Sequence, residues 1–217
     1  MIFPRPVRAV IFDMDGLLVD TEAPVRDALM SAAADIGREL PPAVFMAMVG
    51  TTGSHSDAIL VEHFGEGFDL EAYQAAVWRL LEVQFDIGVP LKPGALELLA
   101  LIDQIGLPKA LVTSSSRRAV DRHLPTEVVA RFAHLITRES VRNSKPHPEP
   151  YLKAAAALGV APQDCLALED SHNGIRSAHA AGMMAVMVPD LLEATDEMRE
   201  KAVAIADSLH DVRVALI

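Results

Sequence analysis

The stretch Val7–Asp20 reads VRAVIFDMDGLLVD and anchors the interpretation of the whole chain. Its apolar run at residues 9–12 contains β-branched and aromatic side chains and is too short for a helix, which predicts a strand buried on both faces. Asp13 and Asp15 follow directly, at the strand end where open α/β sheets bind ligands. Buried charges need partners and oxygen ligands suit hard cations, so these two carboxylates favour a Mg²⁺ site.

The composition is that of an ordinary globular protein, since 51% of the 217 residues are hydrophobic and 23% are charged. A formal net charge of −11 argues against nucleic acid as a partner, because phosphate backbones bind basic surfaces. No apolar run has the length of a membrane span or a signal segment, so we expect no membrane partner and a cytoplasmic location. The single cysteine, Cys165, cannot form an internal disulfide, which fits that location. We expect a monomer or a weak oligomer.

Two parts of the chain differ in their sequence pattern. Residues 17–88 predict only helices, with a loop rich in glycine and hydroxyl groups at 50–56. Further on, short apolar runs alternate with helices, which is typical of βαβ units and a mostly parallel sheet. The first strand must belong to that sheet, because a single buried strand is not stable alone. We therefore expect a doubly wound, Rossmann-like α/β core, residues 1–16 and 89–217, with an all-helical cap domain inserted after the first strand.

Two later segments place groups that can bind an anion at predicted strand ends. Thr113, Ser114 and Ser115 follow an apolar run and lead into a helix, so they either bind an anion or only cap that helix. Lys145, within Ser144-Lys145-Pro146, either holds a phosphate near the acids or lies in a solvated loop. Each segment taken alone favours the structural explanation.

A third segment brings two more acids to a strand end. Glu169 and Asp170 follow the apolar run 165–168 and precede a predicted helix. The dipole of that helix favours one acid at its start. It does not explain why acids follow both this strand and the first strand, which ends at Asp13. The carboxyl ends of parallel strands meet at one edge of a sheet, so we expect these acids to lie close to Asp13 and Asp15.

Together these groups allow phosphoryl transfer. Asp13 can attack phosphorus and form an aspartyl-phosphate. Asp15 can protonate the leaving oxygen and then activate water. Thr113 and Lys145 can hold the phosphoryl oxygens. Mg²⁺ bound by Asp13, the backbone carbonyl of Asp15 and Asp170 would neutralise charge.

Four motifs carry a family resemblance: DMDGLLVDTE at 13–22, TSS at 113–115, SKP at 144–146 and EDSHNGI at 169–175. In this order they resemble the motifs of the haloacid dehalogenase superfamily, in the branch with a helical cap after the first strand. The resemblance implies the roles assigned above. It further implies that Glu169 is a metal ligand or an acid placed just behind the metal.

Substrate contacts are expected from Ser114, Ser115, Thr21 and His55. His55 belongs to the predicted 50–56 loop, which should face the crevice in a protein of this branch. A surface loop without a ligand is the alternative for that segment.

Within the branch, the chain looks like the β-phosphoglucomutase-like and sugar-phosphate phosphatase group, but it departs from the mutase pattern. Val25 stands where the mutases carry a histidine, and Val49 and Gly53 stand where they carry a lysine and an arginine. A mutase must hold a second phosphate from the cap side, and residues 17–88 contain no lysine and three arginines. We therefore expect a Mg²⁺-dependent phosphatase for a small phosphorylated metabolite, a sugar or polyol phosphate. The alternatives are a phosphosugar mutase and, less favoured, a catalytically silent binding module.

Overall fold

The computed structural model describes residues 1–49, 51 and 53–217. The chain divides into two compact units, one formed by residues 1–20 with 90–217 and the other by residues 21–89. Within the described residues, no helix combines the length and the apolar character that crossing a membrane requires. Two positions of the predicted 50–56 loop, Gly50 and Thr52, lie outside the described residues.

The first unit is built on a parallel sheet of six strands in the order β3-β2-β1-β4-β5-β6. This order confirms the predicted doubly wound α/β fold, because the chain builds the sheet outward in both directions from β1. The strands are β1 (Ala9–Phe12), β2 (Lys109–Val112), β3 (His134–Ile136), β4 (Cys165–Glu169), β5 (Met184–Met187) and β6 (Ala204–Ile205).

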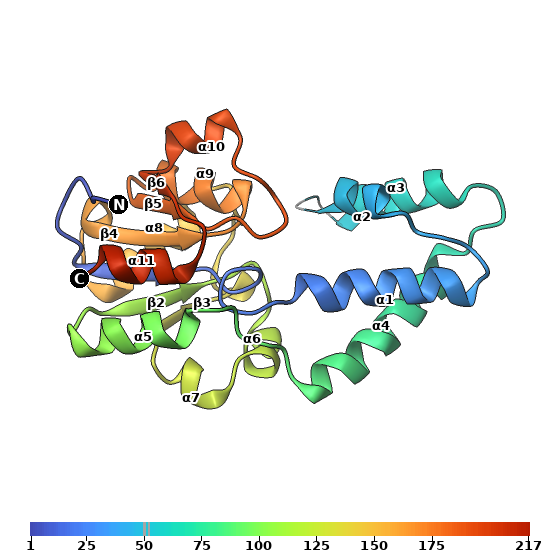
Figure 1. The fold of residues 1–217 in the computed structure, drawn as a ribbon, viewed down its shortest axis with the longest axis horizontal. Helices are drawn as coiled ribbons and strands as arrows, with labels where there is room; N and C mark the ends of the chain where they lie inside the picture. The colour runs from blue at the N-terminus through green and yellow to red at the C-terminus, as the bar shows by residue number, and fades with distance from the viewer. Residues whose placement is uncertain (50, 52) are drawn as a thin grey trace. The chain divides into compact units, whose positions relative to one another are not determined.

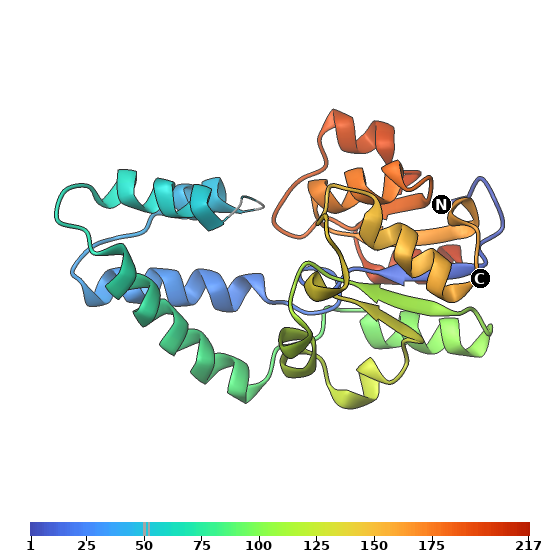
Figure 2. The ribbon, with the colours of Figure 1, turned by 180° about the vertical axis from the view of Figure 1, so that it is seen from behind.

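Helices cover both faces of this sheet. α8, α9 and α10 pack on one face through small and aliphatic side chains, and α5 and α11 lie over the other face (Figures 1 and 2). The helices of this unit are α5 (Ala95–Gln104), α6 (Arg117–His123), α7 (Thr126–Val129), α8 (Glu149–Leu158), α9 (His172–Ala180), α10 (Asp196–Lys201) and α11 (Leu209–Ala215), with short 3₁₀ turns η1 (Arg138–Ser140) and η2 (Pro162–Asp164).

β1 lies inside the sheet, between β2 and β4, and all four of its side chains are buried, as its apolar run predicts. The ladder extends one residue further, because the Asp13 amide donates to the Leu168 carbonyl at 3.0 Å. Asp13 therefore has a fixed backbone at the edge of the sheet where the strands end.

A tight turn follows β1. The amides of Leu18 and Val19 both donate to the Met14 carbonyl, and the Gly16 amide donates to the Val19 carbonyl. Gly16 has φ +78°, a conformation that other residues rarely adopt. The chain re-enters the first unit at residue 90, and it is bonded to the end of this turn because the Asp20 amide donates to the Pro90 carbonyl at 2.9 Å.

The second unit contains four helices among its described residues: α1 (Glu22–Asp35), α2 (Pro42–Met48), α3 (Gly53–Phe64) and α4 (Leu70–Ile87). α1 and α4 pack against each other, and the Tyr73 hydroxyl of α4 donates to the Leu29 carbonyl of α1 at 2.7 Å. The helical character of this segment was predicted correctly, but α3 begins at Gly53. His55 is therefore an exposed residue of a helix and not of a loop.

Candidate active site

The carboxyl ends of β1, β2 and β4 are neighbours in the sheet, and several predicted site residues meet there. Asp13 follows β1, Thr113 follows β2, and Glu169 and Asp170 stand at the end of β4. Carboxylate oxygens of Asp13, Glu169 and Asp170 lie within 4.8 Å of one another. The first two of these acids are buried and the third is half-buried.

Lys145 joins this cluster from the loop before α8. Its ammonium donates to the Asp13 carboxylate at 2.5 Å, to the Glu169 carboxylate at 2.6 Å and to the Val112 carbonyl at 3.0 Å. An ammonium has three N–H donors, so these three acceptors use all of them. The side chain is only 6% exposed, which excludes the solvated-loop alternative for this lysine.

Glu169 is fully buried and accepts hydrogen bonds on both carboxylate oxygens. Oε1 accepts from the ammonium of Lys145 and from the Tyr151 hydroxyl, each at 2.6 Å. Oε2 accepts from the Ser171 hydroxyl at 3.0 Å and the Ser171 amide at 3.4 Å. A carboxylate offers about four lone-pair sites. The hydrogen bonds therefore favour, of the two roles predicted for Glu169, the acid behind the metal that orients Lys145.

Two glycines make room for the acids. A Cβ on Gly174 would lie 1.8 Å from the carboxyl carbon of Glu169, so only glycine lets α9 approach this side chain. A Cβ on Gly16 would lie 2.3 Å from an oxygen of Asp170. Both glycines belong to the sequence motifs, but their contacts with specific carboxylates were not predicted.

Asp15 is oriented by groups from the segment after β2. Its Oδ2 accepts from the Ser115 hydroxyl at 2.7 Å and from the Thr113 hydroxyl at 3.3 Å. The Ser115 amide in turn donates to the Thr113 hydroxyl oxygen at 2.9 Å. His123, at the end of α6, places its Nδ1 3.7 Å from Asp15 Oδ1. Serine and threonine here hold an acid, and Ser116, not Ser115, caps α6.

The remaining predicted contacts lie outside the cluster. Ser114 is exposed, and no hydrogen bond of its side chain occurs within the described part of the chain. Thr21, which is buried, and His55, which is exposed, belong to the second unit. Their predicted contacts with substrate stay predictions.

Sequence reasoning missed three side chains of the site: Tyr151, His123 and Glu149. Glu149 accepts hydrogen bonds from the Arg142 and Asn143 amides at 2.9 and 3.0 Å and so closes the loop that carries Lys145. These hydrogen bonds, with that from Lys153, lower the pKa of Glu149 to about 2. An acid four residues after the lysine is the one sequence signal that could have indicated this closure.

The electrostatics of the cluster are dominated by burial and by like charges. Burial, with the charges of Glu169 and Asp15, raises the pKa of Asp13 to about 8, although Lys145 opposes this shift. The pKa of Asp170 is raised by burial and by the charges of Asp13 and Glu169. Burial alone would lower the pKa of Lys145, but its two carboxylate partners outweigh burial and raise it. The single positive charge of Lys145 therefore does not neutralise the negative charge of Asp13, Glu169 and Asp170.

The donor set fits a hard divalent cation. Asp13 and Asp170 offer oxygen atoms in a buried, negatively charged cluster, which is the ligand type that Mg²⁺ prefers. Burial and the neighbouring carboxylates raise the pKa of Asp13 and of Asp170, and a bound cation would oppose both shifts.

Comparison with known proteins gives a consistent result. A family model described as haloacid dehalogenase-like hydrolase matches residues 7–182. Hexitol phosphatase B of Escherichia coli is 34% identical over 200 residues, covering 87% of this chain and 86% of the relative. A Drosophila melanogaster protein named "Probable pseudouridine-5'-phosphatase" is also 34% identical, over 193 residues, covering 86% of this chain and 83% of the relative.

The fold has a close match among solved structures. A haloacid dehalogenase family hydrolase from Deinococcus radiodurans, solved with bound phosphate and sodium, superposes with a TM-score of 0.84. The two chains are 26% identical, and the match covers 97% of this chain and 95% of the other.

Proposed function

The chain belongs to the haloacid dehalogenase-like hydrolases, and on that basis we propose that it is a Mg²⁺-dependent phosphatase that acts through an aspartyl-phosphate. The substrate would be a small phosphorylated metabolite, with sugar and polyol phosphates as the first class to test. The observation that carries the proposal is the contact between the Lys145 ammonium and the Asp13 carboxylate. This contact lies at the sheet edge where Glu169 and Asp170 also place their carboxylates.

In this proposal Asp13 is the nucleophile. Its Oδ1 already contacts Lys145 at 2.5 Å, which leaves Oδ2 to attack phosphorus. The lysine holds the nucleophile in place and offers positive charge where phosphoryl oxygens gather. Glu169 keeps the lysine there, since its own position is fixed by Tyr151 and Ser171.

Asp15 would act as the general acid and then as the general base. The hydroxyls of Thr113 and Ser115 donate to Oδ2 of Asp15 and so orient this carboxyl group for proton transfer to the leaving oxygen and afterwards from water. The Thr113 hydroxyl, predicted to bind the phosphoryl group, is better placed to orient this acid. Asp15 would first protonate the leaving alcohol and then take a proton from the water that hydrolyses the aspartyl-phosphate on Asp13. The two steps together are a net hydrolysis of the phosphate ester.

Asp13, Asp170 and the backbone carbonyl of Asp15 would hold Mg²⁺, with Glu169 directly behind them. When bound, the cation supplies positive charge that stabilises the phosphoryl oxygens and keeps Asp13 ionised. Burial raises the pKa of Asp13 to about 8, and a proton bound there would oppose its role as the nucleophile.

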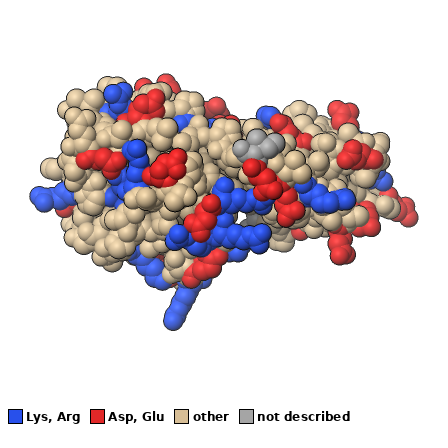
Figure 3. Space-filling view, turned by 90° about the horizontal axis from the view of Figure 1, so that it is seen from below, with Lys and Arg blue, Asp and Glu red and all other residues tan. Residues whose placement is uncertain are grey.

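Phosphatase is favoured over mutase because the second unit is poorly equipped to hold a second phosphate. Residues 21–89 carry eleven acidic side chains against three arginines and no lysine. Figure 3 shows acidic side chains spread over this unit, at the right of the view.

The test is release of inorganic phosphate from a panel of several dozen phosphorylated metabolites. We expect stoichiometric release from at least one of them, loss of release with EDTA, and recovery on adding Mg²⁺. Phosphorus NMR on a hexose 1-phosphate separates the alternatives, because a mutase converts one isomer into another without net phosphate release. A folded protein that releases no phosphate from the whole panel would contradict the proposal.

A further inference from the structure

Asp190 brings another carboxylate to the sheet edge that carries the catalytic cluster, and no step of the proposed function uses it. The residue follows β5, which is the neighbour of β4 in the sheet. The Val188 amide donates to the Glu169 carbonyl at 2.7 Å, so the chain stays paired with the end of β4 almost as far as Asp190. Parallel strands place the residues at their carboxyl ends in the crevice that binds ligands. Asp190 therefore lies among the segments that form the site.

Lys92 holds one oxygen of this carboxylate. Its ammonium donates to Oδ1 of Asp190 at 2.6 Å, and the two side chains are 23% and 14% exposed. The backbone of Lys92 is fixed as well, because its amide donates at 2.8 Å to the carbonyl of Leu18 in the turn after β1. A charge-assisted hydrogen bond between partly buried groups restricts the rotation of the carboxylate. The other oxygen of Asp190 therefore has a defined direction.

That other oxygen, Oδ2, is buried and accepts no hydrogen bond within the described part of the chain. A buried acceptor without a donor costs about 1–3 kcal/mol, and more when it belongs to a charged group. Atoms of this kind are rare in native proteins and commonly mark a functional group or the place of a bound water or ion. We therefore expect a ligand of the site to supply the donor for Asp190.

Gly16 shows which part of the site this oxygen faces. A Cβ on Gly16 would lie 2.3 Å from Oδ2 of Asp170 and 3.5 Å from Oδ2 of Asp190. The two carboxylate oxygens thus approach the same point beside the turn after β1. Asp170 is one of the acids that fit a divalent cation, so the oxygen of Asp190 lies next to a candidate metal ligand.

We propose that Asp190 is a positioning residue for the cation, whose Oδ2 accepts a hydrogen bond from a water molecule that Mg²⁺ brings into the site. This inference rests on the proposed Mg²⁺ site and adds a residue to it that is not a direct ligand. Mg²⁺ loses its water reluctantly and usually keeps several water molecules when carboxylates bind it. Groups that hold the ligands of a metal from outside affect its affinity about 10- to 100-fold. Lys92 would aim Asp190 at that water.

Binding of Mn²⁺ to the full-length, substrate-free protein tests this inference without any turnover. Calorimetry gives the dissociation constant, and the relaxation of water protons by bound Mn²⁺ reports the water molecules held on the ion. Asp190→Asn keeps the shape and an oxygen for Lys92 but turns an amide donor toward Asp170. We expect it to weaken Mn²⁺ binding about 10- to 100-fold and to change the relaxation. Lys92→Gln leaves Asp190 charged but removes the group that aims it, and it should weaken binding as well.

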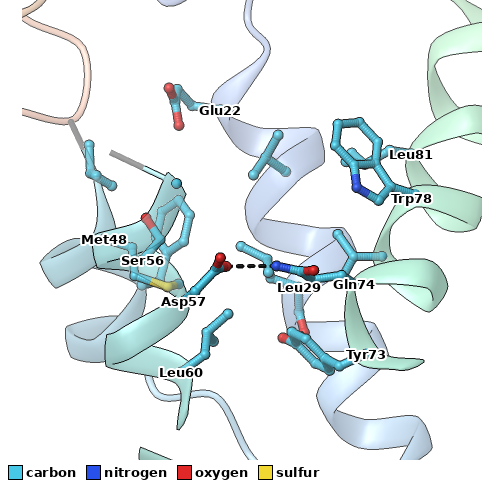
Figure 4. A pocket seen from close by; sticks show the side chains of 15 residues that line it. Glu22, Leu29, Met48, Ser56, Asp57, Leu60, Tyr73, Gln74, Trp78 and Leu81 are labelled. Carbon is cyan, nitrogen blue, oxygen red and sulfur yellow. Dashed lines mark hydrogen bonds between the residues drawn. The ribbon is translucent and has the colours of Figure 1, made fainter. Parts of the chain in front are cut away.

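Asp57→Asn is the matched control. Asp57 is also half-buried and also accepts a side-chain hydrogen bond, from the Gln74 amide at 2.7 Å, but it belongs to the second unit (Figure 4). The variant removes the same charge from the protein and should leave both the affinity for Mn²⁺ and the relaxation unchanged. Asp170→Asn tests the proposed metal site itself and should abolish the binding that Asp190→Asn only weakens.

Three results would overturn the role of Asp190. They are Mn²⁺ binding by Asp190→Asn as tight as by Asp57→Asn, an unchanged relaxation in Asp190→Asn, and tighter binding by Lys92→Gln. The last result would show that only the net charge near the ion matters. A failure of the phosphatase proposal looks different, because the protein would then release no phosphate while the variants still differ in Mn²⁺ binding.

Discussion

Replacing Glu169 by glutamine tests whether this acid orients Lys145 or ligates the metal. The substitution preserves shape and removes one negative charge from a fully buried side chain. In the structure, Oε1 of Glu169 accepts from Lys145 and Tyr151, both at 2.6 Å. Glutamine can offer one oxygen to these two donors, but its amide group must then face Ser171, whose own amide is a donor. Lys145 keeps Asp13 and the Val112 carbonyl as partners.

The magnitude is bounded by the ion pair between Lys145 and Glu169, which glutamine replaces with a weaker hydrogen bond to an amide oxygen. Hydrogen bonds to charged groups contribute about 1.5–3 kcal/mol. If the whole loss falls on the transition state, kcat drops about 10- to 100-fold, since each 1.36 kcal/mol is roughly a factor of ten. Tyr151→Phe, which removes the second donor of Oε1 without changing charge, is the matched control and should lower kcat by less.

The assay is phosphate release as a function of Mg²⁺ concentration. If Glu169 acts by holding Lys145, kcat of Glu169→Gln stays low at saturating Mg²⁺ and the apparent affinity for Mg²⁺ changes little. If Glu169 is a direct ligand, the apparent affinity falls by a large factor and added Mg²⁺ restores kcat. Full recovery of kcat at high Mg²⁺ would refute the orienting role of Glu169.

Three further predictions follow from the same site. Because burial raises the metal-free pKa of Asp13 to about 8, Mg²⁺ competes with a proton: its apparent affinity should fall about tenfold per pH unit below that value, and equal affinities at pH 6 and pH 8 would contradict this. Gly174→Ala forces a Cβ against Glu169 and should cost about 1–3 kcal/mol in urea unfolding, whereas Gly53→Ala, where a Cβ meets nothing within 4 Å, should cost less. Asp15→Asn should lower kcat for substrates with alkoxide leaving groups about 100-fold or more, and a smaller loss for a nitrophenyl ester, whose leaving group needs no proton, is the diagnostic control.

The fold was predictable because its signals are local. The short apolar runs of β1, β2, β4 and β5 and the helices between them have clear periodicities, and right-handed βαβ connections leave few ways to arrange them. α11 at 209–215 was not predicted, and α3 was expected to start later, since Gly53 is a weak signal for a helix start.

The sequence allowed prediction of the site residues that follow strands or precede helices at one sheet edge, but not of the contacts between them. Asp13, Lys145, Glu169 and Asp170 were expected to meet, and the structure brings them together at one sheet edge. The hydrogen bonds that give Glu169 its position could not be predicted, because Tyr151 reaches it from a helix whose rotation depends on packing.

The central claim is that Asp13 carries the phosphoryl group during turnover, and trapping that intermediate tests it most directly. The protein, mixed with a substrate from the phosphatase screen and Mg²⁺, would be quenched in acid within the first turnover, digested and mapped by mass spectrometry. We predict one phosphoryl group on the peptide that contains Asp13, and its absence from Asp13→Asn, with turnover reduced about 10⁴-fold or more in that variant. Turnover without phosphorylated protein, or a phosphoryl group on any other residue, would contradict the account.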